Sequence, residues 1–365
     1  MGTKLTVLDF TTTSTYGSPL NVTVPVINGL HHWSCPNTVV HPFIYILVPS
    51  FYFIIFIIGL VGNGMVMAIM CYLHLKSVTD VYIFNLALAD FLFVATLPLW
   101  AISMWFHYKW LFGSVMCIIC AVLAALNMYA SIFFITCMSI DRYHGIVQTM
   151  KSLKTRRVGY AKKLSVFIWF LAFLASIPTI IFRRNDYSEL KKTFRCTMRY
   201  PENASAEWGA GMELMKNTLG FIIPFLLQGV CYFLIYKNLH IDTRNSIRKR
   251  RQSKALRMVI SVVLAFLLCW LPFQVITFIR VLMQLKVITD CRTIGNVQTA
   301  LPITISIAYA NSCINPILYC FVGGRFKNFL LKVFRRRNSK ESYNESSSRF
   351  LGQNGSTHTE LEDCF

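Results

Sequence analysis

Residues 117–143, CIICAVLAALNMYASIFFITCMSIDRY, form an uncharged run of helix length that ends in an ionic triplet. After Cys117 no charge occurs until Asp141 and Arg142, which Tyr143 follows. About 20 apolar residues, each rising about 1.5 Å along a helix, cross the hydrocarbon core of a bilayer. The run therefore predicts a buried membrane helix with a cysteine at one mouth and an ion pair at the other.

The composition is that of a membrane protein, because 55% of the residues are hydrophobic, 14% are charged and the mean hydropathy is +0.51. The net charge of +20 is also compatible with nucleic-acid binding. The basic residues, however, cluster in short segments between apolar runs, as they do on the cytoplasmic side of membrane proteins. We therefore expect no nucleic-acid partner. The beginning of the chain lacks the apolar core of a signal peptide, so we expect the first membrane helix to direct insertion.

Seven long apolar runs dominate the sequence, and each is long enough to span a bilayer. They predict an all-α, multi-pass membrane protein, a seven-transmembrane helix bundle over residues 42–322. The runs lie at roughly 43–72, 80–104, 115–141, 163–182, 212–237, 256–284 and 297–321.

Three further segments flank the predicted bundle. Residues 1–41 are rich in Thr, Ser and Asn, so we expect a disordered and glycosylated N-terminal segment. In residues 323–337, apolar residues recur at helical spacing opposite Lys and Arg, which predicts a short amphipathic eighth helix in contact with membrane lipids. Residues 338–365 are rich in Ser and Thr and indicate a phosphorylatable cytoplasmic tail.

Two glycosylation acceptors indicate the orientation. Asn21 and Asn203 each begin an Asn-x-Ser/Thr sequence, and four predicted spans lie between them, so both face the same side. The basic residues at 151–157, 248–251 and 335–337 fall on the other side. We expect a plasma-membrane protein with an extracellular N-terminus.

Asp90 lies in the middle of the second run, where a carboxylate is costly and marks a functional site by default. We expect it to face polar residues of the third and seventh runs, where a small cation such as sodium can share the site. A protonated structural acid is the alternative. The expected neighbours are Asn127, Ser131, Asn311, Ser312 and Asn315.

The triplet Asp141, Arg142 and Tyr143 closes the third run on the predicted cytoplasmic side. An Arg142 that pairs with Asp141 holds a resting state, whereas a released Arg142 is free to meet a cytoplasmic partner and Tyr232 or Tyr319. The alternative is a cation that snorkels from a helix end to the interface.

Prolines lie inside three spans, at Pro224, Pro272 and Pro316. Each removes one intrahelical hydrogen bond and kinks its helix, so the three provide hinges for a helix-swinging switch. A lone proline is usually a tolerated bend. Here Trp270 lies close to Pro272 and Asn315 lies beside Pro316, which favours a conformational device.

Four of the twelve cysteines lie between the runs or at their mouths. Cys117 and Cys196 can join a loop to the mouth of the third run, and Cys35 and Cys291 can tie the N-terminal segment to the loop before the seventh run. Sequence alone does not fix this connectivity, and free thiols are the alternative.

These motifs occur in the order found in the rhodopsin-like G protein-coupled receptors, which the chain resembles over roughly 43–335. They are Asp90, Asp-Arg-Tyr at 141–143, Cys-Trp-Leu-Pro at 269–272 and Asn-Pro-x-x-Tyr at 315–319. Finer stretches are similar to the angiotensin II receptors, most of all the type 2 subtype, among them 97–101, 110–113, 130–139 and 214–220. The resemblance implies a receptor for a peptide hormone that signals through a heterotrimeric G protein or arrestin.

The resemblance also implies a ligand site in the outer half of the bundle. In that family, a lysine of the fifth span and an arginine entering the outer loop hold the peptide's C-terminal carboxylate, and they match Lys216 and Arg183. Alternatively, Lys216 pairs with a lipid headgroup or with Glu213. Trp100 is also explained as an interfacial aromatic residue. Other matches to pocket-lining positions, besides Trp100, are Tyr52, Tyr309, Ile305 and Gln274.

Two positions depart from the family. Acids at the outer ends of its sixth and seventh spans receive the peptide's basic second residue, and here Arg280 and Gln298 stand at those positions. Glu213, one turn above Lys216, is an acid that the type 2 receptor lacks there. We expect Glu213 to pair with Arg280 across the mouth of the bundle, or else to receive the ligand's cation.

Other functions fit parts of the sequence. The same fold with a basic pocket suits another acidic peptide or an anionic lipid. A transporter or channel needs inverted repeats, half-helices or a polar line through the span, and an enzyme needs a nucleophile–base or metal cluster on one side of the membrane. None of these is visible in the sequence, so, apart from the sodium ion near Asp90, we expect neither catalytic nor metal-ligating residues.

Overall fold

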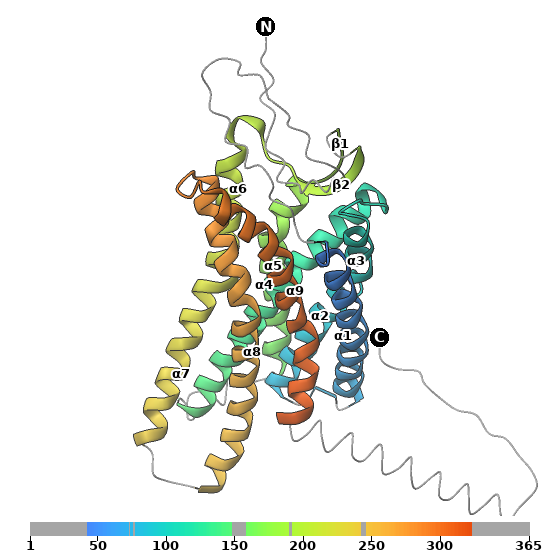
Figure 1. The fold of residues 1–365 in the computed structure, drawn as a ribbon. Helices are drawn as coiled ribbons and strands as arrows, with labels where there is room; N and C mark the ends of the chain where they lie inside the picture. The colour runs from blue at the N-terminus through green and yellow to red at the C-terminus, as the bar shows by residue number, and fades with distance from the viewer. Residues whose placement is uncertain are drawn as a thin grey trace, which may run out of the picture.

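The computed structural model describes residues 42–72, 74–75, 77–147, 158–189, 192–241 and 246–322. Within this part of the chain, seven helical segments are long and apolar enough to cross a membrane, and they run side by side in one elongated bundle (Figure 1). The predicted all-α seven-helix bundle is therefore confirmed. The N-terminal segment at 1–41, the eighth helix at 323–337 and the tail at 338–365 lie outside the described residues.

The helices begin and end near the limits of the apolar runs, but several extend into polar sequence. Asp290 caps the last helix, because its Oδ2 accepts a hydrogen bond of 2.8 Å from the Thr293 N–H. The elements are α1 (Ile44–Tyr72), α2 (Val78–Val94), α3 (Leu97–Trp105), α4 (Gly113–Ile146), α5 (Val158–Phe182), η1 (Glu202–Ala204), α6 (Ser205–Asn217), η2 (Thr218–Ile222), α7 (Ile223–Ile241), α8 (Ser246–Gln284) and α9 (Cys291–Val322).

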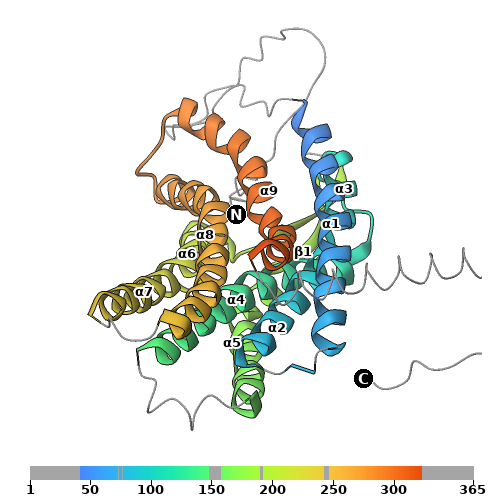
Figure 2. The ribbon, with the colours of Figure 1, turned by 90° about the horizontal axis from the view of Figure 1, so that it is seen from below.

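The end-on view shows how the seven spans surround a common interior (Figure 2). Helix α4 packs against α2, α5, α7 and α8, and α9 packs against α1 and α8. Buried side chains of α2, α4, α8 and α9 fill the middle, while leucines, isoleucines and phenylalanines are exposed on the outer faces. This distribution suits a lipid environment, because apolar side chains on the outer faces match the lipid tails.

Two of the spans are interrupted. The second span turns at Thr96, whose Oγ1 donates a 2.7 Å hydrogen bond to the Phe93 carbonyl, and Pro98 restarts the helix in the first turn of α3. The fifth span widens into the π-helical turn η2, where the Ile223 N–H reaches the Thr218 carbonyl. The turn ends two residues before Pro224, which has no N–H to donate. The predicted hinge at Pro224 therefore coincides with an irregular turn.

Prolines inside helices are more numerous than predicted. Pro272 lies inside α8 and Pro316 inside α9, as expected. Pro49 in α1, Pro178 in α5 and Pro302 in α9 were not counted among the hinges, although they also lie inside helices. A proline is therefore not by itself a sign of a hinge in this bundle.

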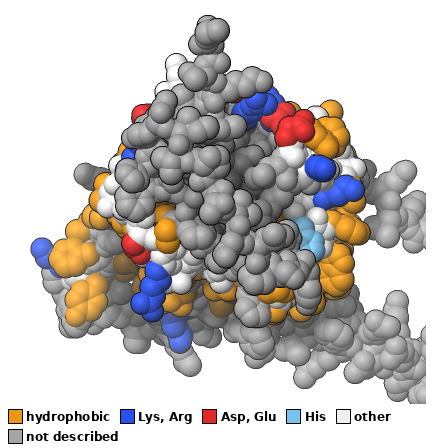
Figure 3. Space-filling view, turned by 45° about the horizontal axis from the view of Figure 1, so that its top comes forward, with side chains coloured by type: hydrophobic (Ala, Val, Ile, Leu, Met, Phe, Trp, Pro, Cys, Tyr) orange, Lys and Arg blue, Asp and Glu red, His pale blue; other side chains and the backbone are white. Residues whose placement is uncertain are grey.

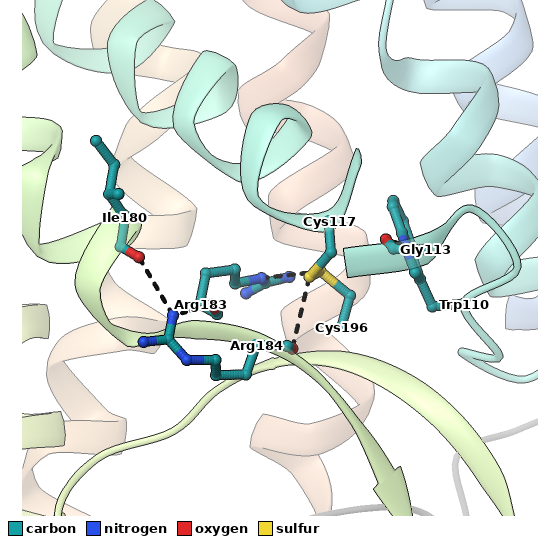
Figure 4. The surroundings of a disulfide bond; sticks show 7 residues. All are labelled: Trp110, Gly113, Cys117, Ile180, Arg183, Arg184 and Cys196. Carbon is teal, nitrogen blue, oxygen red and sulfur yellow. Dashed lines mark hydrogen bonds between the residues drawn. A yellow bond between two sulfur atoms is a disulfide. The ribbon is translucent and has the colours of Figure 1, made fainter. Parts of the chain in front are cut away.

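A β-hairpin, which was not predicted, covers one end of the bundle. Strand β1 (Arg183–Ser188) pairs antiparallel with β2 (Thr193–Met198), and Asn185 lies opposite Cys196. The Cys117–Cys196 disulfide is confirmed, with a Cα–Cα distance of 5.6 Å, and it fastens β2 to the start of α4 (Figure 4). We call this the disulfide end and the opposite end, which carries Arg142, the Arg142 end.

Cys291 is also disulfide-bonded, at the start of α9. Because Cys35 lies outside the described residues, the Cys35–Cys291 pair stays a prediction.

Candidate functional site

Asp90, buried in α2, accepts hydrogen bonds from asparagines of two other helices. Asn127 Nδ2 of α4 lies 2.7 Å from Oδ1, and Asn315 Nδ2 of α9 lies 2.9 Å from Oδ2. Ser312 Oγ donates to Asn127 Oδ1 at 3.5 Å, and Ser131 Oγ accepts from Asn127 Nδ2 at 3.4 Å. Both carboxylate oxygens are thus paired in a buried interior, where an unpaired oxygen is costly.

The remaining member of the predicted cluster behaves differently. Asn311 is buried in α9, but within the described part of the chain no hydrogen bond joins it to Asp90. Asn63 of α1 was not predicted, and its Nδ2 donates to the carbonyls of Gly59 at 2.9 Å and Ser312 at 2.8 Å. It ties α1 to α9. Its sequence signal is an asparagine inside an otherwise apolar run.

The two aromatic residues near the helix-interior prolines are buried with unpaired polar atoms. The Trp270 ring stacks on Phe266, with centroids 5.5 Å apart and an interplanar angle of 19°, and meets Phe273 edge-on at 6.0 Å. Among the described residues, Trp270 Nε1 and the Tyr319 hydroxyl have no hydrogen-bond partner. Buried donors without partners are rare in a rigid core, so they favour a region that adopts a second conformation.

Arg142 contacts both Asp141 and Thr79. Its Nη2 lies 2.8 Å from Asp141 Oδ2 and also donates to Thr79 Oγ1 at the start of α2. The predicted Asp141–Arg142 pair is therefore confirmed. Tyr232 of α7 shares a 2.9 Å hydrogen bond with Ser139 Oγ of α4. These contacts connect α2, α4 and α7 at the Arg142 end.

Two hydroxyl residues of this end were not predicted. Ser139 lies three residues before Arg142, so helical spacing alone is a signal for it. Thr79 is 63 residues away from Arg142, and only the packing of α2 on α4 brings it there. Tyr143, the last residue of the triplet, is half-buried with its ring 5.4 Å from that of His144.

Arg183 stands at the junction of α5 and β1 and extends toward the disulfide (Figure 4). Its Nε donates to Cys196 Sγ at 3.1 Å, and its guanidinium carbon lies 5.2 Å from the centre of the Trp100 ring. Burial lowers the pKa of the Arg183 guanidinium to about 10, so the group stays charged at neutral pH. Within the described residues no acid forms an ion pair with it, which leaves its charge available to an anion.

An aromatic group lies beside Arg183. The Tyr309 ring is 5.6 Å from the Tyr52 ring and 4.7 Å from the Phe93 ring, and Tyr309 interacts electrostatically with Arg183. The structure thus brings together four of the predicted ligand-site residues, Tyr52, Trp100, Ile305 and Tyr309.

A second group of charges lies where α6 faces α8. Glu213 Oε1 is 3.6 Å from Lys216 Nζ, one turn later in α6, and 3.6 Å from Arg280 Nη1 of α8. The predicted Glu213–Arg280 pair is confirmed, and the pairing of Lys216 with Glu213, which the sequence left open, is present as well. Lys and Arg side chains are spread around the margin of this end, above hydrophobic flanks (Figure 3).

Tyr200 links the two groups at the disulfide end. It interacts electrostatically with Glu213, Arg280 and Arg183. Burial, followed by the negative charge of Glu213, raises the pKa of Tyr200 to about 12, so its hydroxyl is neutral at physiological pH. Its position therefore joins Arg183 to the ion pairs of α6 and α8.

Amide side chains complete this region. Asn217 Nδ2 donates to Thr277 Oγ1 at 3.2 Å and to the Glu213 carbonyl at 3.0 Å, which fixes α6 against α8. Both amide atoms of Gln274 and Oε1 of Gln298 are buried without hydrogen-bond partners among the described residues. These atoms are polar groups that a ligand can satisfy.

The glycosylation acceptors stay predictions. Asn203 is exposed in η1, just before α6 at the disulfide end, and Asn21 lies outside the described residues. The exposure of Asn203 is compatible with a bulky sugar.

Comparisons with known proteins agree with this arrangement. Residues 62–319 match the family "7 transmembrane receptor (rhodopsin family)". The chain is 45% identical to the type-2 angiotensin II receptor of Homo sapiens over 291 residues, 79% of either chain. It is 43% identical to the type-1 angiotensin II receptor of Gallus gallus over 305 residues, 83% of this chain and 85% of that receptor. The two subtypes are thus similar to it to nearly the same degree. The chain belongs to the rhodopsin family of seven-transmembrane receptors, in which angiotensin II receptors are among its relatives.

Proposed function

We propose that the chain is a plasma-membrane receptor for a peptide hormone of the angiotensin II type, with its N-terminus and disulfide end outside the cell. The observation that carries the proposal is 43% and 45% identity, over about four fifths of the chain, to receptors named for angiotensin II. Arg183 lies beside an aromatic group and Lys216 lies in α6 next to Glu213, and both are cations, which is chemistry suited to a peptide's C-terminal carboxylate. The position of the acceptor Asn203 at the disulfide end supports the orientation.

The Arg142 end is the proposed signalling surface. The pair with Asp141 and the hydrogen bond to Thr79 hold Arg142 in a resting arrangement, and movement of the helices releases it to a heterotrimeric G protein. Arrestin is the second proposed partner, recruited once the Ser- and Thr-rich tail is phosphorylated. Tyr232 and Tyr319 are the proposed contacts of the released arginine.

The interior of the bundle is the proposed switch and sodium site. Asn311 Oδ1 and Asn315 Oδ1 are buried oxygens without hydrogen-bond partners among the described residues, and Asn315 also donates to Asp90. Hard cations such as sodium take oxygen ligands. When bound, sodium supplies a charge that compensates the carboxylate. A higher unfolding temperature in sodium chloride than in choline chloride, absent in Asp90→Asn, is the expected result. Equal unfolding temperatures in sodium chloride and choline chloride would contradict the proposed sodium site.

A second candidate function keeps the fold and changes the ligand to another acidic peptide or an anionic lipid. The observation that favours it is the charge at the disulfide end, where Lys216 and Arg280 share the acid Glu213 and Arg183 forms no ion pair among the described residues. Arg280 and Gln298 stand where the related receptors are expected to carry acids for the peptide's basic residue.

Saturation binding of labelled angiotensin II to cells that express the chain tests the proposal. Saturable binding that unlabelled peptide displaces, absent from untransfected cells, is expected. No specific binding, on cells whose surface expression is confirmed with an epitope tag, overturns the assignment of angiotensin II and turns the search to acidic peptides and lipids.

A further inference from the structure

Glu213 occupies the position beside Lys216 that a ligand carboxylate needs. Its Oε1 lies 3.6 Å from both Lys216 Nζ and Arg280 Nη1, while Oε2 has no hydrogen-bond partner among the described residues. The receptor therefore already holds an anion at the site proposed for the anion of its ligand. Any incoming carboxylate has to compete with it.

The contacts of Glu213 are loose enough to exchange. Charge-assisted hydrogen bonds between nitrogen and a carboxylate are about 2.7–2.9 Å long, so 3.6 Å neutralises charge without forming a good hydrogen bond. The side chains of Lys216 and Arg280 are 23% and 33% exposed, whereas that of Glu213 is 11% exposed. The two cations are thus approachable while the acid lies behind them.

Arg280 offers Glu213 a better place once Lys216 is taken. A guanidinium presents parallel N–H donors that match both oxygens of a carboxylate, and the unpartnered Oε2 supplies the second acceptor for such a pair. Lys216, by contrast, is a point charge that binds either carboxylate equally well. When a ligand carboxylate binds Lys216, both oxygens of Glu213 can pair with Arg280. Each charged side chain of the group then has an opposite charge beside it.

We propose that Glu213 is a tethered counter-anion, which the carboxylate of the ligand displaces from Lys216 onto Arg280. Glu213 then determines specificity, because only a ligand with an anionic group at this point can replace Glu213 beside Lys216. This inference rests on the proposed function for the identity of the peptide, but not for the competition between two carboxylates at Lys216.

The test compares peptides that differ only at the carboxylate. Affinities of angiotensin II with a free C-terminal carboxylate and of its C-terminal amide are measured on wild type, Glu213→Gln and Arg280→Gln. The ratio of the two affinities isolates the carboxylate, because other contacts of the peptide cancel. Glu207→Gln is the matched control, since Glu207 lies in the first turn of the same helix, is exposed and forms no ion pair among the described residues.

The ratio is expected to rise about tenfold in Glu213→Gln, which equals about 1.4 kcal/mol, and to fall in Arg280→Gln, where Glu213 keeps Lys216 as its only cation. Glu207→Gln is expected to leave it unchanged. A ratio that stays constant in Glu213→Gln overturns the proposal and leaves Glu213 a structural acid. A ratio that falls in Glu213→Gln also overturns it, because the acid then helps the carboxylate rather than competing with it.

A second measurement does not depend on the hormone. The unfolding temperature of the purified receptor is compared in sodium phenylacetate and in neutral phenylacetamide with sodium chloride at the same ionic strength. The carboxylate is expected to stabilise Glu213→Gln more than wild type, and the double variant Glu213→Gln/Lys216→Ala is expected to lose this gain. Equal responses of wild type and Glu213→Gln overturn the counter-anion even where angiotensin II proves to be the wrong ligand.

Discussion

Asp90 and Glu213 are both buried carboxylates, but the protein holds them in opposite ways. Asp90 accepts hydrogen bonds of 2.7 and 2.9 Å from two neutral amides, one on each oxygen. Glu213 presents one oxygen to two cations, both at 3.6 Å, and its other oxygen has no hydrogen-bond partner in the described part of the chain. The first carboxylate is fixed by geometry, whereas the second is only neutralised by charge.

The difference follows from how the two interactions fade with distance. A hydrogen bond to a neutral amide weakens steeply outside its short range, so it joins α2, α4 and α9 in one arrangement. Attraction between full charges falls only as the inverse of distance and persists at 3.6 Å. The interior acid is therefore suited to define a conformation, and the acid at the disulfide end is suited to exchange partners with a ligand.

Asp90→Ala is expected to have the largest effect. It leaves the amide groups of Asn127 and Asn315 buried without acceptors, and each such group costs about 1–3 kcal/mol, so the free energy of unfolding should fall by about 2–6 kcal/mol. Thermal unfolding of the purified receptor measures the change. The free energy of unfolding should fall less in Asp90→Asn, which keeps one acceptor oxygen. A loss in Asp90→Ala no greater than that in Glu207→Ala contradicts the fixed role of Asp90.

Lys216→Ala should weaken binding of the peptide by about 2–5 kcal/mol, because a buried charge pair loses one partner. Competition binding on intact cells measures the affinity, and surface labelling checks that expression persists. Lys216→Arg, which keeps the charge, should retain more of the affinity. An affinity that Lys216→Ala leaves unchanged removes Lys216 from the ligand site.

Arg280→Asp should raise the affinity for angiotensin II at least about tenfold, or 1.4 kcal/mol. The change removes a like charge opposite the basic second residue of the peptide, and such a juxtaposition costs several kcal/mol. The loss of Arg280 also leaves Glu213 with Lys216 as its only cation, so the ligand carboxylate displaces Glu213 less easily. We expect the gain in affinity to exceed this opposing effect. Binding curves at two salt concentrations measure it, because screening should shrink the gain. Equal affinities of both receptors at both concentrations show that position 280 does not face the peptide.

Tyr232→Phe should have the smallest effect, a loss of about 0.5–1.5 kcal/mol of stability. It removes one neutral hydrogen bond, the 2.9 Å contact with Ser139 Oγ, and keeps the ring. The unfolding temperature measures it, with Ser139→Ala and the double variant completing a cycle. Strictly additive losses from the two single changes argue against a direct contact.

Much of the bundle was predictable because long apolar runs, and polar residues inside them, are strong sequence signals in a membrane protein. A carboxylate inside an apolar run has to find partners, which is why Asp90 pointed correctly to Asn127 and Asn315. The Glu213–Arg280 pair was predictable for a related reason, since both are long charged side chains on adjacent helix ends. The same logic applied to Asn63 would have found the link between α1 and α9.

Other features depend on tertiary packing that local sequence does not carry. Strand β1, RRNDYS, has no alternation of apolar and polar residues, and the hairpin forms against α4, to which a disulfide fastens it. Thr79 meets Arg142 only because α2 packs on α4. Asn311 was expected to face Asp90 together with Ser312 and Asn315, but no hydrogen bond in the described part of the chain joins Asn311 to Asp90.

The structure of the receptor with its peptide bound tests the exchange of partners most directly. We predict that Lys216 Nζ binds the C-terminal carboxylate of the peptide, that both oxygens of Glu213 face the Arg280 guanidinium, and that the peptide does not reach Asp90. A bound structure in which Glu213 still lies 3.6 Å from Lys216, with the peptide carboxylate elsewhere, would contradict it.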